Sequence, residues 1–259
     1  MELRDTFNQV AKEYDKFRPK YPSQLFTDIL EYACIKQNDD ILEIGCGTGQ
    51  ATQGFIELGY RNLTCIELGQ NLAEFTREKF KDETSLRVIH SSFETWQNDK
   101  SHFKLAISGT AFHFIQPQEV GYRKVFDLLS SQGSIAFFWT IHVPSSDATF
   151  NLIRECYRVY APQLDDSKNM TMAQVIDERS ALTLQDGLFK DLEVKQYSWN
   201  DAYTSDEYIS LLNTNSRHRV LPEDVRSDLF SGIKKIIDQN GGTVIKPQAV
   251  ALFLARKND

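Results

Sequence analysis

Short apolar runs alternate with longer amphipathic stretches through the first 140 residues of the chain. Apolar runs at 41–44, 63–66, 86–90, 104–108 and 134–140 have the length of buried strands. The stretches 24–34, 50–58, 70–80 and 118–129 carry apolar residues at helical spacing instead. This alternation predicts a doubly wound α/β fold with a mostly parallel sheet.

The second half of the chain has fewer apolar runs. A helical stretch over 147–160 and a polar connection over 162–172 come first, and two further strands are predicted at 192–199 and 249–255. A long insertion separates these strands, and it carries helical patterns at 205–212 and 222–240. We therefore expect one domain over 1–259. Its insertions at 142–185 and 200–245 are expected to form helical caps on the side where an acceptor substrate would bind.

Three glycines follow the first apolar run, in the sequence Ile41-Leu-Glu-Ile-Gly-Cys-Gly-Thr-Gly49. They lie at a predicted strand-to-helix turn, where a residue without a Cβ lets the backbone approach a ligand closely. The helix that follows offers unpaired N–H groups and a partial positive charge at its start. The turn is therefore a candidate binding site for a polar or anionic group.

Two acidic residues flank this turn along the chain. Glu67 ends the second predicted strand, twenty residues after Gly47, where a carboxylate accepts hydrogen bonds from ribose hydroxyls. Glu43 precedes the first glycine and would repel the phosphates of a dinucleotide but attract an ammonium group. The third glycine of the dinucleotide motif is also replaced, by Gln50. The pattern predicts an adenosine-containing cofactor and disfavours the alternative of a nicotinamide-dependent oxidoreductase.

Charge and composition narrow the possible partners. The formal net charge of −7 and the isoelectric point near 5.3 argue against a protein that grips nucleic-acid phosphates. No apolar run approaches the roughly 20 residues of a membrane span, and the N-terminus has no apolar core of a signal peptide. The four cysteines and five histidines show no ligand-like spacing, so we expect reduced thiols, a cytoplasmic protein and no metal site.

The motif Glu43-Ile-Gly-Cys-Gly-Thr-Gly49 resembles the first motif of the class I S-adenosylmethionine-dependent methyltransferases. In that family the acidic residue serves the methionine amino group, directly or through water, and the glycine loop packs against the methionine part. The resemblance implies S-adenosyl-L-methionine as the cofactor. It also implies a Rossmann-like sheet of seven strands, six of them parallel and the C-terminal one antiparallel. The cofactor-binding candidates of this motif are Glu43, Gly45, Cys46, Gly47 and Gly49, with Glu67 for the ribose.

A second resemblance covers the N-terminal segment. From Ala11 the chain is similar to the A-x-x-Y-D-x-x-R-P-x-Y-P signature of a small-molecule group that includes the trans-aconitate and the ubiquinone and menaquinone methyltransferases. In that group the segment folds over the cofactor, so residues 1–36 are expected to form a helical lid. The resemblance assigns Tyr14 and Arg18 to the methionine end, with Arg18 as the partner of the methionine carboxylate.

Further cofactor candidates follow the second, third and fourth predicted strands. The resemblance places Leu68 on the adenine ring and assigns backbone contacts with the adenine amino group to Ser92 and Phe93. Family members usually carry an Asp where this chain has Ser92, so the resemblance does not extend to the side-chain contact of that Asp. Ser108 ends the fourth strand, and ligands of doubly wound sheets bind beyond the carboxyl ends of the strands.

The segment Ala111-Phe-His-Phe114 resembles the A-x-H-W sequence that the family often shows after strand four. His113 is therefore the catalytic candidate, as the acceptor of the nucleophile's proton, as a residue that orients the substrate, or as a partner of the backbone. Predicted substrate contacts are the aromatic residues Phe112 and Trp139 and, from an L-L-x-T-x-S pattern, Asn213, Thr214 and Ser216.

These residues predict transfer of the sulfonium methyl group to a small-molecule acceptor by in-line displacement. A non-catalytic module that binds S-adenosylmethionine as a regulatory or partner protein is a further alternative. Neither the acceptor nor the atom that is methylated follows from the sequence.

Overall fold

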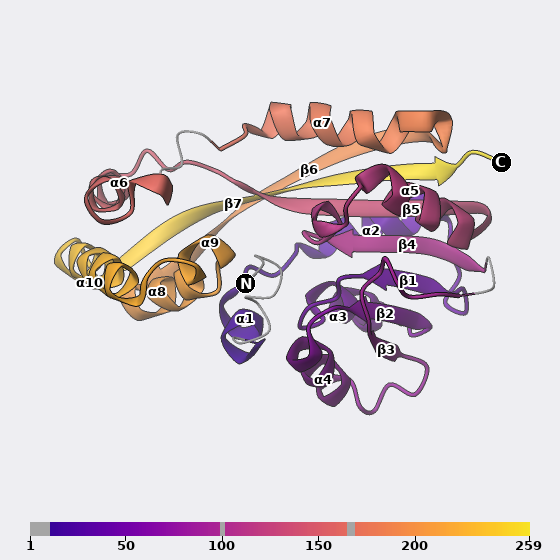
Figure 1. Cartoon of the computed structure of the whole chain (residues 1–259), viewed down its shortest axis with the longest axis horizontal. Coiled ribbons are helices and arrows are strands. Elements are labelled where there is room, and N and C mark those ends of the chain that lie inside the picture. Colours follow the sequence, from indigo (N-terminus) through magenta and orange to yellow (C-terminus); the bar gives the residue numbers. More distant parts are fainter. Residues whose placement is uncertain (1–10, 99–101, 165–168) are drawn as a thin grey trace. The chain divides into compact units, whose positions relative to one another are not determined.

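The computed structural model describes residues 11–98, 102–164 and 169–259 (Figure 1). Residues 1–10 of the expected N-terminal lid lie outside the described residues, and the described part begins with a helix at Ala11. The strands are β1 Ile41–Ile44, β2 Leu63–Glu67, β3 Arg87–His90, β4 Phe103–Gly109, β5 Leu129–His142, β6 Phe189–Thr204 and β7 Thr243–Lys257. The α-helices are α1 Ala11–Phe17, α2 Ser23–Ala33, α3 Gln50–Glu57, α4 Gln70–Lys79, α5 Gln118–Leu128, α6 Ala148–Tyr160, α7 Met172–Leu184, α8 Ser205–Asn213, α9 Ser216–Arg219 and α10 Glu223–Gln239. Short 3₁₀ helices are η2 Phe112–Phe114, η3 Pro162–Leu164 and η5 Gln185–Gly187.

All seven strands form one sheet in the order β3-β2-β1-β4-β5-β7-β6. The sheet is mostly parallel, and the C-terminal strand β7 runs antiparallel to its neighbours (Figure 1). The predicted Rossmann-like fold is thereby confirmed. The strand order reverses between β1 and β4, which pair in parallel with Ile41 opposite Leu105. Ligands of such sheets bind at this reversal, beyond the carboxyl ends of the strands.

Two compact units share the chain. Unit 1 takes the chain up to Pro19 together with His142–Met170 and Ser198–Ala249. Unit 2 takes Lys20–Ile141, Thr171–Tyr197 and Val250–Asp259. Strands β6 and β7 each contribute one part to unit 1 and the other to unit 2.

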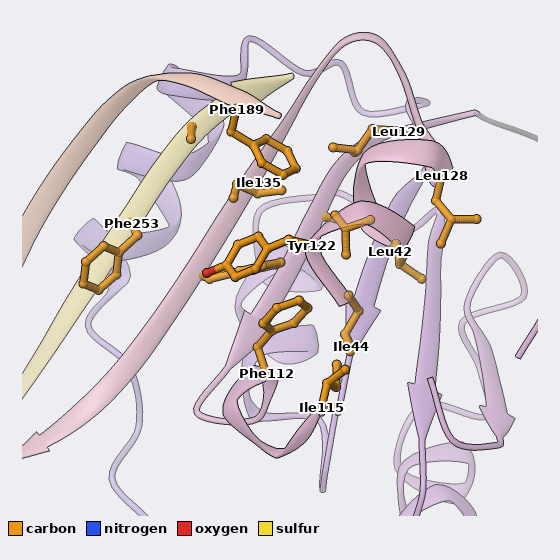
Figure 2. Packing of buried hydrophobic residues seen from close by; sticks show 14 of the residues in the cluster. Leu42, Ile44, Phe112, Ile115, Tyr122, Leu128, Leu129, Ile135, Phe189 and Phe253 are labelled. Carbon is orange, nitrogen blue, oxygen red and sulfur yellow. The ribbon is translucent and has the colours of Figure 1, made fainter. Parts of the chain in front are cut away.

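The core of unit 2 is built from strands together with helices α5 and α7. Phe112, Tyr122, Ile135 and Phe253 are among its buried members (Figure 2). The core of unit 1 is built mainly from α6, α8 and α10. Its buried α10 residues are Leu229, Ile233 and Ile237, which confirms the apolar stripe predicted for that helix.

Three strands, β5, β6 and β7, are longer than their apolar runs predict, because their outer parts are polar or interrupted. Strand β7 begins at Thr243 rather than near Ala249, and it includes Pro247, which lacks a backbone N–H and is unusual inside a strand. Strand β6 alternates between exposed and half-buried residues over most of its length. Pairing along the sheet therefore extends these strands beyond the segments that hydrophobicity marks.

Helix α7 has no counterpart among the predicted elements. Its apolar residues Met172, Val175 and Ile176 have helical spacing and pack on the unit 2 core, but the charged Arg179 takes the next position on this face. The capping box between Thr171 and Gln174 is the signal in the sequence that marks the start of this helix.

Candidate functional site

The glycine turn joins β1 to α3 with all three glycines in the left-handed region. Their φ angles are +73° at Gly45, +57° at Gly47 and +76° at Gly49. A Cβ on Gly45 would lie 2.4 Å from the Ala111 Cβ, and one on Gly49 would lie 2.4 Å from the Phe80 ring. A Cβ on Gly47 would meet nothing within 4 Å. Two glycines are therefore required by packing, whereas Gly47 presents bare backbone to open space.

Glu67 reaches back from the end of β2 to this turn. Its carboxylate accepts hydrogen bonds from the backbone N–H groups of Gly47 and Gly69, both at 2.8 Å, and from that of Leu68. Burial raises the pKa of Glu67, and these N–H groups oppose that rise. A carboxylate has about four acceptor positions, so binding both ribose hydroxyls would require Glu67 to release one backbone bond.

Glu43 lies beneath the turn and is 1% exposed. The Thr52 hydroxyl donates to its Oε2 atom at 2.6 Å, and Cys65 Sγ lies 3.6 Å from the same oxygen. Burial raises the pKa of Glu43 to about 7, and the charge of Glu67 contributes in the same direction. Glu43 is thus a buried carboxylate without a cationic partner among the described residues, a state that a nearby ammonium group would stabilise.

Two residues of α4 hold the turn from the other side, and the sequence analysis did not identify them. The Thr76 hydroxyl donates to the Gly47 carbonyl at 2.7 Å, and Lys79 Nζ donates to the Thr48 carbonyl at 3.2 Å. Their spacing of three on one helix face was the available signal. The Thr48 Oγ1 atom is buried and has no hydrogen-bond partner among the described residues.

The residues at this turn fit the cofactor that the sequence predicts. Gly47 offers open backbone, Glu67 offers an acceptor for ribose, and Glu43 offers a negative charge for an ammonium. Cys46 is buried in the turn and contributes its backbone there. The positions of both carboxylates, each bonded to the turn or to its helix, agree with one shared binding region.

The residues expected near the adenine, Leu68, Ser92 and Phe93, differ in burial and in their hydrogen bonds. Ser92 Oγ accepts from the Thr95 backbone N–H at 3.2 Å and so closes a turn, while Leu68 stays half-buried. The Phe93 side chain is 4% exposed within the core, and Lys124 Nζ donates to its carbonyl at 2.6 Å. The carbonyl groups of both residues are thus engaged, since that of Ser92 accepts from the Trp96 N–H at 2.9 Å, and the implied contacts of this segment with the adenine stay a prediction.

Ser108 has a contact inside the sheet. It is fully buried, and its hydroxyl donates to the Ile44 carbonyl at 2.8 Å. This bond fixes the end of β1 directly before the glycine turn. The geometry supports an indirect role for Ser108, in place of the direct cofactor contact that the end of a strand predicts.

Tyr21 belongs to the N-terminal signature and lies in unit 2. Its hydroxyl is 3.3 Å from Thr110 Oγ1, and its ring packs edge-on against Phe138 with a centroid distance of 4.8 Å. Thr110 itself has a φ of +56° directly after β4. Tyr21 therefore supports the loop after β4, a role that the sequence analysis did not assign to it.

His113 lies in η2 and its ring is held by Trp139. The Trp139 Nε1–H group donates to His113 Nδ1 at 3.2 Å, which assigns the proton of the neutral ring to Nε2. Burial, together with the charge of Arg179, lowers the pKa of His113 to about 4. The ring is therefore neutral at physiological pH and presents an N–H donor. A role as proton acceptor is disfavoured.

Arg179 of α7 completes this group, and the sequence analysis missed it together with its helix. Its guanidinium lies 4.9 Å from the centre of the Trp139 ring, and Nη1 donates to Gln118 Oε1 at 3.0 Å. The Nε atom is buried without a partner among the described residues. An open hollow of about 620 Å³ adjoins this side of unit 2, lined by Gln116, Gln118, Glu119, Glu178, Ala181, Leu182, Leu184 and Gln185.

Phe112 is not available to a substrate in this structure. It is fully buried in the core (Figure 2). Its ring stacks on Phe137 at a centroid distance of 4.3 Å. Neighbouring side chains of the 3₁₀ turn point in different directions. Phe112 therefore points into the core, whereas His113 is only partly buried. The predicted contact of Phe112 with the acceptor is corrected accordingly. The Trp139 side chain is 5% exposed, and its Nε1–H group donates a hydrogen bond to His113.

The remaining candidates belong to unit 1. Arg18 donates from Nε to Thr214 Oγ1 at 2.9 Å and from Nη2 to the Thr214 carbonyl at 2.8 Å. Its guanidinium also lies 4.9 Å from the centre of the Tyr14 ring. Thr214 is fully buried, and Asn213 and Ser216 lie on either side of it at the ends of α8 and α9. The predicted roles of these residues with cofactor and substrate stay predictions.

Among the described residues, no helix is long and apolar enough to cross a membrane. The same residues contain no group of three or more His, Cys, Asp or Glu side chains that could hold a metal ion.

Comparison with known proteins agrees with this site. Residues 41–133 match the sequence model of a methyltransferase domain family. A malonyl-[acyl-carrier protein] O-methyltransferase of Priestia megaterium is 25% identical over 231 residues, which cover 82% of this chain and 82% of the relative. An uncharacterized methyltransferase of Schizosaccharomyces pombe is 21% identical, over 90% of this chain and 87% of the relative.

Solved structures show the same fold. A phosphoethanolamine N-methyltransferase 2 from Haemonchus contortus, in complex with S-adenosyl-L-methionine, superposes with a TM-score of 0.58 at 15% identity. That similarity covers 100% of this chain and 60% of the solved one. A Bacillus halodurans protein described only as a candidate methyltransferase gives a TM-score of 0.56 at 12% identity, and the similarity covers 92% of this chain and 100% of the other. The sequence motif, the fold and the family match over residues 41–133 together support a class I S-adenosylmethionine-dependent methyltransferase.

Proposed function

We propose that this methyltransferase acts on a small-molecule acceptor. The observation that carries the assignment to the cofactor is the pairing of Glu67 with the backbone of Gly47, a glycine whose missing side chain leaves open space. The small-molecule acceptor is supported by the N-terminal signature and by the net charge of −7, which is unsuited to gripping nucleic acid. Malonyl-[acyl-carrier protein] and phosphoethanolamine appear in the names of two similar proteins, so an acceptor that carries acidic groups is compatible.

Bound S-adenosylmethionine supplies a sulfonium methyl group that is already activated toward nucleophiles. The chain's own task is therefore alignment and the exclusion of water, which contributes on the order of 7–11 kcal/mol in well-oriented reactions. A general base typically contributes 10²–10⁴-fold, or about 3–5 kcal/mol. In this proposal the glycine turn and Glu67 hold the adenosine, and Glu43 holds the ammonium group.

His113 is proposed to orient the acceptor rather than to remove its proton. Its neutral ring has Nδ1 occupied by the Trp139 N–H and is left with a donor at Nε2. A donor of this kind can hydrogen-bond an acceptor oxygen or nitrogen. Acceptors that need a strong base would then be poor substrates, whereas carboxylates and other groups already ionised at neutral pH would be good ones.

Turnover tests this proposal directly. The chain is incubated with S-adenosylmethionine and a panel of carboxylic acids, phenols, quinol precursors and amines, and release of S-adenosylhomocysteine is measured. We expect turnover with at least one class, and none in a Gly47→Val variant. Tight binding of S-adenosylhomocysteine without turnover on any acceptor would favour the non-catalytic binding module. The cytoplasmic location inferred from the sequence stays a prediction.

A further inference from the structure

Trp139 is the neighbour that fixes the chemical state of the His113 ring. An indole N–H group can only donate a hydrogen bond, so the His113 Nδ1 atom, 3.2 Å from Trp139 Nε1, must act as an acceptor. A charged ring, or a neutral ring with its proton on Nδ1, would place two N–H groups face to face. The orientation of the indole therefore selects one of the three states of the ring, the neutral one with the proton on Nε2.

The Trp139 side chain has two kinds of neighbour in the core of unit 2. The rings of Phe137 and Phe253 lie edge-on to it, at centroid distances of 6.4 Å and 5.4 Å and interplanar angles of 89° and 76°. These contacts are apolar and do not orient a polar N–H group. Arg179 supplies a charged contact, with its guanidinium carbon 4.9 Å from the centre of the indole. A planar guanidinium packs well over the face of a tryptophan, which is the best aromatic partner for a cation.

Arg179 itself is anchored on two helices. It lies on the face of α7 that packs on the unit 2 core, and its side chain is 14% exposed. Its Nη1 atom donates to Gln118 Oε1 of α5 at 3.0 Å, and its Nη2 atom lies 3.4 Å from Glu178 Oε2. The guanidinium is therefore bonded at both of its amino groups, while it also contacts the indole.

A charged side chain is costly at this place in the fold. Removing a guanidinium from water costs free energy that an apolar side chain of similar length would not cost. A link between α7 and the core that only packs could use such an apolar residue, as Val175 and Ile176 do on the same face. Contact of the guanidinium with the residue that bonds the His113 ring gives the charged side chain a role at the site.

We infer that Arg179 is a positioning residue of the methyl-transfer site, which fixes the Trp139 indole and through it keeps the His113 ring neutral with its donor at Nε2. The inference rests on the proposed function, in which that donor orients the acceptor. The positive charge of Arg179 acts in the same direction, because it disfavours a second charge on the His113 ring and, after burial, is the second cause of its low pKa.

The state of the His113 ring can be measured without turnover. In a chain labelled with ¹⁵N in histidine, the shifts of the two ring nitrogens report which of them carries the proton. In Arg179→Met the indole loses its charged contact, so the ratio of the two tautomers should shift toward Nδ1–H by roughly three- to thirtyfold, the range of a cation–π contact. Arg158→Met is the matched control, because it removes an exposed arginine paired with Glu155 and should leave the ratio unchanged.

A double-mutant cycle tests whether Arg179 acts through the indole. Trp139→Phe keeps an aromatic ring but removes the N–H group, so the His113 ring loses its partner at Nδ1 and should populate both tautomers. Adding Arg179→Met to Trp139→Phe should then change the tautomer ratio by less than about twofold. Trp199→Phe is the matched control, because the Trp199 N–H donates to Asp201 at 3.1 Å and its loss should not alter the His113 shifts.

Arg179→Lys separates the charge of this residue from its shape. Lysine keeps the positive charge but lacks the planar guanidinium and its fixed donor geometry toward Gln118. We expect Arg179→Lys to shift the tautomer ratio in the same direction as Arg179→Met, whereas an effect of charge alone would leave the ratio at its wild-type value. This variant also replaces Arg179→Met in the cycle if circular dichroism shows that Arg179→Met folds poorly.

Turnover provides a second measurement once the screen has supplied an acceptor. In Arg179→Met, kcat/KM should fall in proportion to the share of His113 rings that still carry the proton on Nε2, because the other rings offer the acceptor a bare nitrogen. A fall in kcat/KM with a wild-type tautomer ratio would show that Arg179 does not act by positioning His113.

The NMR result decides the inference by itself. A tautomer shift in Arg179→Met and Arg179→Lys that disappears on the Trp139→Phe background supports it. An unchanged ratio in either Arg179 variant, or a shift of equal size on the Trp139→Phe background, overturns it. Absence of turnover with every acceptor would contradict the proposed function but would not alter the tautomer ratios.

Discussion

The glycine turn of unit 2 and three side chains of unit 1, Arg18, Lys246 and His218 (the basic group), differ in how their polar atoms are bonded. At the turn, the carboxylate of Glu67 accepts three backbone N–H groups, and Glu43 is bonded by Thr52. In unit 1, Arg18 and Lys246 are bonded by neutral oxygens, and His218 Nδ1 has no partner among the described residues. The turn is thus largely assembled before a ligand arrives, whereas the basic group has unused donors.

The two regions therefore differ in how ready they are to bind a ligand: the turn is preorganised, whereas the basic group has hydrogen-bond donors that a ligand could use. A site whose groups are already bonded binds a ligand with little loss of conformational entropy, and its geometry depends on the backbone. A site with unmet donors depends on the charge of its ligand, so that affinity changes strongly with that charge. We therefore expect the turn to be sensitive to changes of shape and the basic group to changes of charge.

The largest effect is expected from Gly47→Val. The new side chain enters the space that the turn leaves open, at a φ of +57° that a β-branched residue adopts poorly. We expect calorimetry to show at least about 100-fold weaker S-adenosylhomocysteine binding, since several contacts to the turn are lost together.

Gly187→Val is the matched control for this change. Gly187 has a φ of +64° and open surroundings, but it lies in η5. Both variants should lose about 1–2 kcal/mol of unfolding free energy from backbone strain, and Gly187→Val should keep its affinity for S-adenosylhomocysteine. Normal binding by Gly47→Val would refute the cofactor assignment of the turn.

The second effect concerns the dependence of cofactor binding on pH. Without ligand, Glu43 has a pKa of about 7, above its unfolded value, so it disfavours the folded state increasingly as pH rises from about 4.5 to about 7. A bound ammonium group favours the ionised form and lowers that pKa. Affinity should therefore rise with pH by up to about tenfold per unit until about pH 7 and then level off.

Calorimetry in buffers of different ionisation enthalpy measures the proton released in this binding. Glu43→Gln should abolish both the proton release and the rise, whereas Glu57→Gln at the exposed end of α3 should preserve them. A Glu43→Gln variant with an unchanged pH profile would show that Glu43 does not serve the ammonium group.

A smaller effect is expected from Thr76→Val. The substitution removes the hydroxyl that donates to the Gly47 carbonyl at 2.7 Å and keeps the shape of the side chain. One neutral hydrogen bond contributes about 1 kcal/mol, so S-adenosylhomocysteine binding should weaken about fivefold. Thr27→Val is the control, because it makes the same substitution on a helix where the hydroxyl bonds only its own helix, at 3.4 Å from the Ser23 carbonyl of α2. Equal affinities in the two variants would mean that α4 does not fix the turn.

The last and smallest prediction is that the His113 ring does not change its protonation state between pH 5.5 and 8. Since burial and Arg179 lower its pKa to about 4, the ¹³C and ¹⁵N shifts of its ring should stay constant between pH 5.5 and 8, as for a neutral ring with the proton on Nε2. Arg179→Met should raise that pKa, whereas Arg158→Met, which removes an exposed arginine paired with Glu155, should not. A midpoint near 6.5 in the wild-type chain would restore the role of proton acceptor.

Much of the fold follows from local patterns of the sequence. The strands β1, β2 and β4 and the helices between them coincide with apolar runs and amphipathic stretches, because a buried strand must be apolar on both faces. Helix α7 and the outer parts of β5, β6 and β7 are not marked in this way. Their residues are stabilised by pairing and packing with segments far away in the chain, which no local pattern records.

The sequence by itself determined the glycine turn and its partner Glu67. Gly45, Gly47 and Gly49 adopt φ values that other residues avoid, and the apolar pattern of the second strand places Glu67 at its end. Only the tertiary structure decided that Phe112 is core, that His113 is a neutral donor held by Trp139, and that Arg18 is bonded by the buried Thr214. The physical reason is that backbone conformation is set by neighbouring residues, whereas burial and charge compensation depend on residues brought together by the fold.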